Sequence, residues 1–493
     1  MNTFTRPVPS AWTNVVKMSA FTVGIFGFIG TCLASAGQYL RIDYPVSTDT
    51  NELQVAVTYT LWIPDGAITI RGIIVHQHGA GVDTSKEESS AAYDLHWQAL
   101  AKKWDCALLG PRYHVLTESN IIGARMYVFK VDSLTGKQVL IETNGLHSGS
   151  SSGSEMWFDP RRGSARAFLR VLKDFAAQSG HPEIETVPWA LWGHSGGGIW
   201  SDTLSTLYPE RVVGMWLRSG SMAQFRTHPE YVQPEIPAAC YKIPIMVNPG
   251  AKEEGQFPHN PPGYEKGPWW GNLATFTEYR AHGAFIGFAP DPRTGHECGD
   301  SRYIAIPFLD ACLAMRLPGK ASKDQTLRPI DSSKAWLAPL MGDEAVPAAG
   351  FKGDLKESVW LPNEAIAKAW MEYVKTGAVS DSTPPPAPYD VKTSPKGDQG
   401  TEITWSAEAD FESGIRNFIV LRDGQELAQV PEKPVGKFGR PLFQSMSFGD
   451  TPERPFPKMR YVDISAKAGE KHSYAVITVN SVGLKSAPSQ SSL

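Results

Sequence analysis

The residues best suited to chemistry are 193–197, Gly-His-Ser-Gly-Gly, in which Ser195 stands between two glycines in a G-x-S-x-G pattern. An apolar run, residues 187–192, precedes the pattern, and a segment of helical composition follows it. This context predicts a strand, a tight turn and a helix, an arrangement that presents a serine hydroxyl above a sheet edge while glycines keep Cβ atoms out of a crowded bend. Ser195 is therefore a candidate nucleophile, and a glycine-rich helix start is the non-catalytic alternative.

A second element, upstream of the serine, could stabilise negative charge. The apolar strand core at residues 73–75 runs into residues 76–81, His-Gln-His-Gly-Ala-Gly. When a nucleophile attacks a carbonyl carbon, the carbonyl oxygen gains negative charge, which backbone N–H groups aimed at it can stabilise by several kcal/mol. We expect this oxyanion hole to use the N–H of Gly196, directly after the serine, and an N–H of the Gly79–Ala80 turn.

His76 and His78 occupy alternate positions and could share one face of a strand. A zinc pair is one interpretation of them, and polar residues at a strand end is another. Zinc sites in proteins usually have four ligands or three ligands and a water, and no Cys, Asp or Glu lies close in the sequence to complete such a set. We expect no metal and no cofactor.

A carboxylate and a histidine follow downstream in the order that acyl transfer from a serine requires. Residues 243–250 read as a short buried strand, and Ala-Lys-Glu-Glu follows at 251–254. After a helix-like stretch (272–282) and another strand (285–288), a turn carries His296. The histidine would take the serine proton and return it to the leaving group, while the carboxylate would hold the imidazole tautomer.

The motifs at residues 192–198, 78–81 and 295–296 together resemble those of secreted α/β-hydrolases of the esterase and dienelactone-hydrolase-like group. The resemblance covers about residues 50–320. It implies hydrolysis of carboxylic esters through an acyl-enzyme intermediate, with the chain order nucleophile, acid, histidine.

The resemblance implies Ser195 as nucleophile and His296 as base. In this group the acid commonly follows a Gly-x-x-Asp turn, which falls on Glu253 in register. The chain departs from the pattern in two ways, because a glutamate replaces the aspartate and Glu254 stands beside it. Glu253 is the expected acid, and Glu254 and Asp291 remain alternatives.

The hydrophobic pattern places these motifs on an α/β fold. Strand-like and helix-like segments alternate along the chain, which is typical of a doubly wound, mostly parallel sheet with its site at the carboxyl ends of the strands. The expected strands are residues 52–63, 67–75, 106–109, 189–192, 212–217, 243–247 and 285–288. The expected helices are residues 91–104, 164–177, 197–208 and 303–315.

Between residues 113 and 159 the alternation lapses into a long insertion, and long irregular loops are commonly functional or disordered. We interpret it as a pocket wall. Aromatic side chains there and before the histidine turn could contact an apolar or ring-shaped substrate, or could simply pack in the core. The candidate substrate contacts are Trp157, Phe158, Trp269, Trp270 and, beside the nucleophile, His194.

The chain divides into four parts. These are a signal peptide at 1–36, a catalytic domain with a C-terminal extension at 37–380, a Pro-rich linker at 381–388 and an all-β sandwich domain at 389–493. The linker reads Asp-Ser-Thr-Pro-Pro-Pro-Ala-Pro, a stiff polyproline-type segment. Because every catalytic candidate precedes it, we expect residues 37–383 to fold and to be active alone.

Beyond the linker the hydrophobic period changes to two. Trp405 on an early strand and the closing strand at 474–483 resemble a fibronectin type III-like domain. Residues 429–459 are longer and richer in proline than such a domain needs. We expect the domain to space, present or anchor the enzyme, with contact to an extracellular surface or polysaccharide.

The N-terminus has the pattern of an export signal. Arg6 and Lys17 precede an uncharged run, residues 18–33, that ends in Ala-Ser-Ala at 34–36, an A-x-A cleavage pattern. We expect a secreted or periplasmic protein that begins near Gly37. A retained membrane anchor is the alternative, because the run approaches the ~20 residues that span a bilayer.

Cleavage would remove Cys32 and leave four of the five cysteines in an oxidising compartment. One or two disulfides are then permitted, and a bridge at Cys298 would brace the loop that carries His296. A buried free thiol is the ordinary alternative for Cys106, which lies in an apolar strand.

Composition agrees with a large globular enzyme, since 42% of the 493 residues are hydrophobic and 20% are charged. The formal net charge of −4 excludes the basic footprint of a nucleic-acid binder. Two alternatives to an esterase stay open. One is a prolyl-oligopeptidase-like peptidase, although no propeller repeat precedes the catalytic domain, and the other is a non-catalytic adhesion protein on a hydrolase scaffold.

Overall fold

The computed structural model describes residues 37–49, 51–80, 89–114, 157–225, 233–255, 267–320, 325–455 and 458–490, and the backbone of two strands between residues 126 and 143. Residues 34–493 form one compact unit. The expected signal peptide and most of the expected insertion at 113–159 lie outside the described residues. No helix in the described part of the chain has both the length and the apolar character needed to cross a bilayer.

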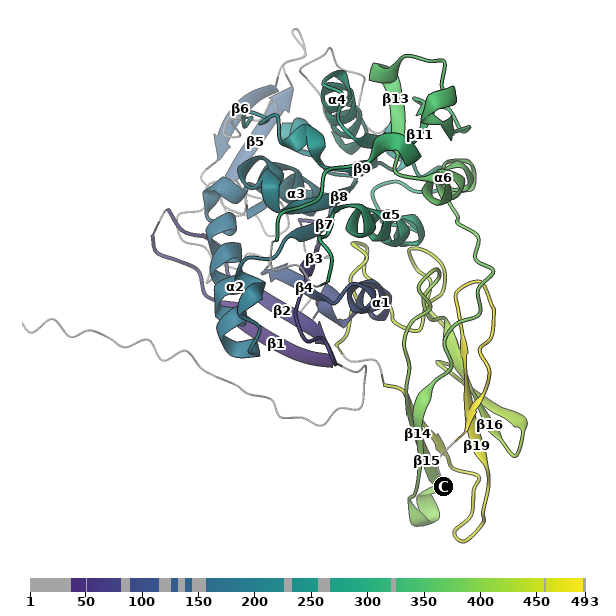
Figure 1. The fold of residues 1–493 in the computed structure, drawn as a ribbon. Helices are drawn as coiled ribbons and strands as arrows, with labels where there is room; N and C mark the ends of the chain where they lie inside the picture. Colours follow the sequence, from purple (N-terminus) through teal and green to yellow (C-terminus); the bar gives the residue numbers. More distant parts are fainter. Residues whose placement is uncertain are drawn as a thin grey trace, which may run out of the picture. The chain divides into compact units, whose positions relative to one another are not determined.

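The protein is built on an eight-stranded sheet in the order β1-β2-β4-β3-β7-β8-β9-β10 (Figure 1). Its strands are β1 (Gly37–Tyr44), β2 (Val57–Pro64), β3 (Gly72–Gln77), β4 (Cys106–Tyr113), β7 (Trp189–His194), β8 (Val212–Arg218), β9 (Ile245–Asn248) and β10 (Ile286–Phe288). The β1–β2 and β2–β4 pairs are antiparallel and all the others are parallel. This order and these directions confirm the expected mostly parallel α/β fold of the hydrolase type.

Strand β1 is not among the strands expected from the sequence. It lies at the sheet edge, and its residues alternate between half-buried and exposed instead of forming a continuous apolar run. The strands expected at 52–63 and 67–75 start later, at Val57 and Gly72. The turn after Pro64, with Gly66 at a φ of 78°, takes up part of the difference.

Helices cover both faces of the sheet. On one face, α1 (Leu95–Lys103) and α5 (Arg302–Arg316) contact each other, and α2 (Ser164–Ser179) and α3 (Gly196–Leu207) lie on the other face (Figure 1). Two further helices, α4 (Gly267–Ala281) and α6 (Glu364–Thr376), and a small sheet of β11 (Trp336–Pro339), β12 (Val346–Pro347) and β13 (Ser358–Leu361) follow along the chain. The backbone of β5 (Met126–Val131) and β6 (Gln138–Thr143) forms an antiparallel pair within the expected insertion.

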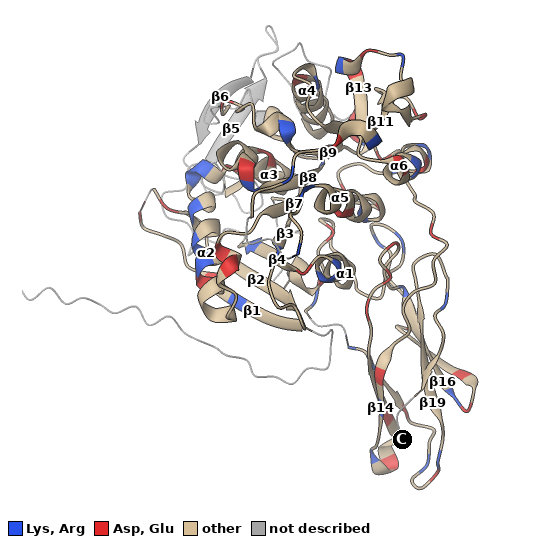
Figure 2. Ribbon diagram, in the orientation of Figure 1, with Lys and Arg blue, Asp and Glu red and all other residues tan. Residues whose placement is uncertain are grey.

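Charged residues occur along the helices of the protein (Figure 2). In α2, for example, Arg166 and Arg170 are exposed while Phe168 is buried against the sheet. Several arginines are buried instead, and Arg218 and Arg302 are the most completely buried among the described residues. Burying a guanidinium requires that its charge and its donors be satisfied inside the protein, so each of these residues marks a structural junction.

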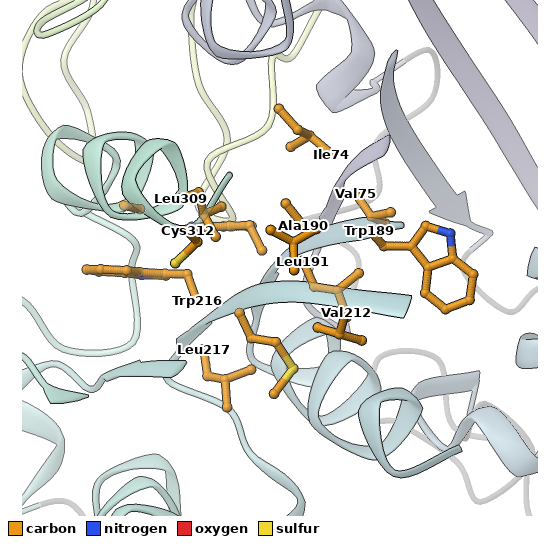
Figure 3. Packing of buried hydrophobic residues seen from close by; sticks show 14 of the residues in the cluster. Ile74, Val75, Trp189, Ala190, Leu191, Val212, Trp216, Leu217, Leu309 and Cys312 are labelled. Carbon is orange, nitrogen blue, oxygen red and sulfur yellow. The ribbon is translucent and has the colours of Figure 1, made fainter. Parts of the chain in front are cut away.

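The core follows from the apolar runs of the central strands, which are buried on both faces as parallel strands usually are. Trp216 of β8 lies with Leu309 and Cys312 of α5 between the sheet and the helix (Figure 3). The fit is close at Gly214, where an added Cβ would lie 2.8 Å from the Sγ of Cys312. Larger side chains at this position would push the helix away from the sheet.

The described cysteines form none of the disulfides that the sequence permits. Cys106, Cys240, Cys298 and Cys312 are all buried and unpaired. Burial raises the pKa of the Cys106 thiol to about 12, so this group stays protonated and behaves as a small apolar side chain. Cys298 therefore does not brace the His296 loop through a bridge.

The C-terminal β domain, residues 389–490, consists of two antiparallel sheets in the orders β14-β15-β18 and β17-β16-β19-β20. Its strands are β14 (Tyr389–Pro395), β15 (Thr401–Ser406), β16 (Asn417–Arg422), β17 (Gln425–Val430), β18 (Arg460–Asp463), β19 (Tyr474–Val479) and β20 (Ser489–Gln490). The two inner faces share one apolar cluster that includes Trp405, Phe418 and Val476. The period-two segments of the sequence thus form the expected all-β sandwich.

The parts before and after the linker contact each other, and that residues 37–383 fold and are active alone stays a prediction. Leu95, at the start of α1, is buried in the apolar cluster of the C-terminal β domain. Arg302 of α5 donates hydrogen bonds to Asp94 (2.7 Å) and to Asp450 of the C-terminal β domain (2.7 Å). Burial alone would lower the pKa of Arg302, but the charges of Asp450 and Asp94 raise it above its ordinary value. Composition could not reveal this junction, because its partners lie more than 140 positions apart in the chain.

Arg302→Leu should lower the free energy of unfolding of the full chain by about 3–5 kcal/mol, because it leaves two buried carboxylates without a counter-charge. Lys102→Ala is the matched control, since Lys102 forms an exposed ion pair with Glu408 across the same junction and should contribute only about 0–1 kcal/mol. Urea denaturation of both variants measures the difference. Equal losses would contradict a structural role for the buried arginine.

Candidate active site

Ser195 occupies a strained turn between β7 and α3. Its φ of 52° and ψ of −118° lie outside the regions that L-residues ordinarily adopt, and such backbone strain costs about 1–3 kcal/mol. The turn has no room for side chains around it. A Cβ on Gly193 would lie 2.2 Å from the carbonyl oxygen of Gly197, and a Cβ on Gly197 would lie 2.3 Å from that of Gln77. The glycines of the motif are therefore required sterically.

The end of strand β8 holds the same turn from the other side. The backbone N–H of Ser195 donates a hydrogen bond to the carbonyl oxygen of Arg218 (2.8 Å). A Cβ added to Gly220 would lie 1.9 Å from the carbonyl oxygen of Ser195. Gly220 lies outside the sequence motif, so its role is visible only in the folded chain.

The structure brings Ser195, His296 and Glu253 into one hydrogen-bonded chain. The Nε2 of His296 lies 2.8 Å from the Oγ of Ser195, and its Nδ1 lies 2.6 Å from Oε1 of Glu253. A carboxylate only accepts hydrogen bonds, so Nδ1 carries the proton and Nε2 accepts from the serine hydroxyl. This is the tautomer that a general base needs.

The geometry distinguishes among the three candidate acids. Glu253 is fully buried, and its second oxygen, Oε2, accepts from the hydroxyl of Ser219 (2.8 Å) and the N–H of Gly250 (2.9 Å). Glu254 is exposed. Asp291 instead accepts hydrogen bonds from the hydroxyl of Tyr373 (3.0 Å) and from the backbone. Only Glu253 reaches the imidazole.

A buried cation, Arg218, fixes the loop that carries His296. Its guanidinium donates to the carbonyl oxygen of Gly295 (2.9 Å), to the hydroxyl of Thr294 (2.9 Å) and to the carbonyl oxygen of Glu297. Burial alone would lower the pKa of Arg218, but the charge of Glu253 raises it. Sequence reasoning missed this residue, although an arginine that closes the apolar strand β8 is a signal, because arginine is rarely buried unless it is paired.

His194 was expected to contact substrate, and the structure places it elsewhere. Its side chain is buried, with Nε2 2.8 Å from the carbonyl oxygen of His296. Burial and the neighbouring imidazole of His296 keep the pKa of His194 well below its ordinary value, so the ring is neutral and its Nε2–H donates to that carbonyl. His194 therefore supports the catalytic loop from beneath, and the expected substrate contact is incorrect.

The expected oxyanion turn lies beside the nucleophile. His78 accepts from the N–H of Tyr113 at Nε2 (3.0 Å), so its Nδ1 carries the proton and donates to the carbonyl oxygen of Gly79 (2.6 Å). In a trans peptide the next N–H points the opposite way, so this bond also fixes the direction of the Ala80 N–H. The Ala80 nitrogen lies 3.1 Å from the position that a Cβ on Gly196 would take.

Gly196 is the first residue of α3, and the first N–H groups of a helix have no partner within it. Ala80 thus lies close to Gly196, the residue after the serine, as the expected oxyanion hole requires. The carbonyl of Gly79 faces away from this position.

The two histidines of the 76–81 segment do not form a metal pair. Both ring nitrogens of His78 are used in the hydrogen bonds above. The ring of His76 stacks on Trp192 with centroids 3.8 Å apart and meets the edge of Trp97. Burial lowers the pKa of His78 to about 4, so it stays neutral at physiological pH.

The expected aromatic substrate contacts have mixed outcomes. Trp157 is buried, stacked on Tyr113 with centroids 4.2 Å apart, and Phe158 is buried beside it. Trp269 is buried against Phe288. These three side chains pack in the core, which favours the packing alternative for them, whereas Trp270 on α4 is only partly buried. The aromatic ring that does lie beside His296 is Phe448 of the C-terminal β domain, which the sequence did not single out.

No family model matches the chain, and no curated protein matches it. Several solved structures are similar. An S-formylglutathione hydrolase from Agrobacterium tumefaciens is 15% identical with a TM-score of 0.33, over 58% of this chain and 96% of that one. A carboxylesterase from Mesorhizobium loti is 17% identical with a TM-score of 0.29, over 55% and 98%. A ferulic acid esterase is 11% identical with a TM-score of 0.31, over 53% and 92%.

Gly220→Ala should displace Ser195, because the new methyl group would overlap the serine carbonyl oxygen. We expect a loss of about 1–3 kcal/mol in stability. We also expect a roughly 10²-fold slower reaction of Ser195 with a fluorophosphonate, since a nucleophile displaced by about 1 Å loses its alignment. Gly319→Ala, at an exposed glycine with open space around it, is the control. Unchanged labelling of Gly220→Ala would show that the turn does not depend on this contact.

Proposed function

We propose that the protein is a serine hydrolase that cleaves carboxylic esters through an acyl-enzyme on Ser195. The observation that carries the proposal is the hydrogen-bonded chain from Ser195 through His296 to the buried Glu253, at 2.8 and 2.6 Å, on a strained strand-to-helix turn. Each of the three side chains arrives from a different strand end of the same sheet. The proposal rests on the geometry of this site, because the similar solved structures have low identities and low TM-scores.

The chemistry follows from the positions of the groups. His296 removes the proton of Ser195 as the oxygen attacks the ester carbonyl carbon, and the carbonyl oxygen becomes negative while facing the N–H groups of Gly196 and Ala80. The C–O bond to the alcohol then breaks, and Nε2 of His296 gives its proton to the departing oxygen. A water molecule, deprotonated by the same nitrogen, attacks the acyl-enzyme, and the carboxylic acid leaves as Ser195 regains its proton.

Charge pairing explains why the base works in a largely buried site. When His296 takes the proton, the imidazolium is held by Glu253, whose own position is fixed by the Ser219 hydroxyl and the Gly250 N–H. The carboxylate stabilises the charged ring without taking its proton. His296 itself keeps 32% of its side chain exposed, so substrate and water can reach it.

The geometry speaks against a non-catalytic adhesion protein. A scaffold has no reason to keep Ser195 in a strained conformation, to bury a glutamate and to pair it with a histidine that meets the serine. The same three side chains could also hydrolyse amides, but no observation on the described residues favours a peptidase. Ester hydrolysis is the function that the site supports best.

We propose that the C-terminal β domain is fibronectin type III-like. Its three-stranded and four-stranded sheets enclose Trp405 on the early strand β15, which packs edge-on against Phe418 of β16 with centroids 5.3 Å apart. Tyr474 opens the late strand β19 and donates to Asp463 of the opposite sheet (2.8 Å). These features match the motifs on which the resemblance rests.

Ser195→Ala should lower kcat for p-nitrophenyl acetate by about 10⁴-fold or more and abolish labelling by a fluorophosphonate, because only the oxyanion donors and substrate binding remain. Circular dichroism should show an unchanged fold. Turnover near that of the wild type would refute the assignment of the nucleophile.

Glu253→Gln should lower kcat by about 10³- to 10⁴-fold, since an amide cannot hold the imidazole in the required tautomer. Glu254→Gln is the matched neighbour and should stay within about twofold of wild type, because its side chain is exposed. Steady-state kinetics of both variants on one ester decide between them. Similar losses in the two variants would move the acid to another residue.

A further inference from the structure

The segment that joins β17 to β18, residues 431–459, extends from the C-terminal β domain to the loop that carries His296. It belongs to neither sheet of that domain. Among its described residues the only pairings of strand type are two isolated bridges, Val435 with Leu442 and Met446 with Pro452. Two strands can be joined by a much shorter connection, so the contacts of this segment with the rest of the protein indicate its role.

Side chains of the 431–459 segment bind the loops around the active site. The amide of Gln444 accepts from the N–H of Leu95 (2.9 Å) and donates to the carbonyl oxygen of Tyr93 (2.7 Å). The N–H of Arg440 donates to Asp300 (2.7 Å), which lies four positions after His296. The segment thus binds both the start of α1 and the residues that follow His296.

A buried ionic contact fixes the segment more firmly. Arg302 lies between Asp94, which caps helix α1, and Asp450, and all three side chains are at most 5% exposed. Charges buried in this way are tolerated only when their partners are in place, so the contact specifies one position for the backbone at Asp450. Asp450 also has a φ of 59°, as expected for a tight turn.

The turn before Asp450 carries an aromatic side chain to the catalytic histidine. The N–H of Ser447 donates to Thr451 (2.8 Å) and that of Asp450 donates to Ser447 (3.1 Å), which closes the turn. At its tip, the carbonyl oxygen of Phe448 accepts from the N–H of Cys298 (3.3 Å), two residues beyond the catalytic histidine.

The ring of Phe448 therefore lies beside the imidazoles. Its centroid is 6.0 Å from that of His296 and 5.7 Å from that of His194. Phe438 of the same segment meets it edge-on at 5.4 Å. Phe448 is only partly buried, and the imidazole of His296 is among its neighbours.

The reaction chemistry says which part of a substrate lies there. The acyl carbon is bonded to Ser195 in the intermediate, whereas the alcohol oxygen receives its proton from Nε2 of His296. The alcohol group must therefore lie on the histidine side of the serine when it departs. Phe448 lies next to the same imidazole.

We propose, on the basis of the ester hydrolysis argued above, that Phe448 determines alcohol specificity. Together with Phe438 it forms an aromatic wall for the alcohol part of the substrate, and the substrates are esters of alcohols that carry an aromatic ring. Ring-to-ring contact in offset or edge geometry favours such a group over an alkyl chain. The C-terminal β domain is then part of the active site and not only a spacer.

The test uses the purified full chain and two series of esters. The first keeps an acetyl group and compares benzyl acetate with ethyl acetate, whose alcohols have similar acidity, and the second keeps ethanol and compares acetate with butyrate. For Phe448→Ala we expect the ratio of kcat/KM for benzyl over ethyl acetate to fall about tenfold, while the butyrate-to-acetate ratio stays within about twofold.

Phe448→Leu is the conservative variant, which fills the same space without a ring and should also lower the benzyl preference. Val435→Ala is the control in the same segment, because Val435 is 51% exposed and should leave both ratios unchanged.

A benzyl preference that falls alone supports the proposal. Equal falls in both series, or an unchanged benzyl ratio in both Phe448 variants, would overturn it and leave ester hydrolysis intact. A wild-type chain that hydrolyses neither series, and whose Ser195 does not react with a fluorophosphonate, would overturn the proposed function and this inference with it.

Discussion

The site depends on one buried guanidinium, that of Arg218. Its donors hold backbone carbonyl groups of the loop that carries His296, and the negative charge of Glu253 raises its pKa. Glu253 is itself buried, and its carboxylate accepts from Ser219 and Gly250 and contacts the imidazole of His296. One side chain at the end of β8 therefore fixes the position of His296.

A second buried arginine fixes a loop where the C-terminal β domain contacts α1 and α5. Arg302 is buried between Asp94 and Asp450, and neither carboxylate has another cation as close among the described residues. Two buried arginines thus fix two loops, one carrying His296 and one carrying Phe448. Because a buried charge without its partner is costly, both loops have one favourable position each, which a catalytic group requires for alignment.

Local signals made the fold and the hydrogen-bonded serine, histidine and glutamate predictable. The G-x-S-x-G turn, the strand before it and the order serine, acid, histidine depend on neighbours in sequence, and they placed Ser195, His296 and Glu253. Contacts across the chain were beyond reach: nothing near Cys298 or Trp269 in sequence shows that one is an unpaired core thiol and the other a core ring. Gly220 and Arg218 act on Ser195 and His296 only after β8 lies beside β7.

The largest departure from the sequence-based view concerns the C-terminal β domain, and its cause is physical. A polyproline linker is stiff and exposed, which is the usual mark of a boundary, but it says nothing about contacts made by a later segment. The 431–459 segment returns to the catalytic loops through Arg440, Gln444 and Asp450, and Leu95 of α1 in turn enters the domain's own core. This interface contains both a buried ion pair and a buried apolar contact, so the stability of the C-terminal β domain and that of the part before the linker depend on each other. The loop that carries His296 is then held by Arg218, and Phe448 lies beside the ring of His296, so the surroundings of this histidine come from residues more than 200 positions apart in the chain.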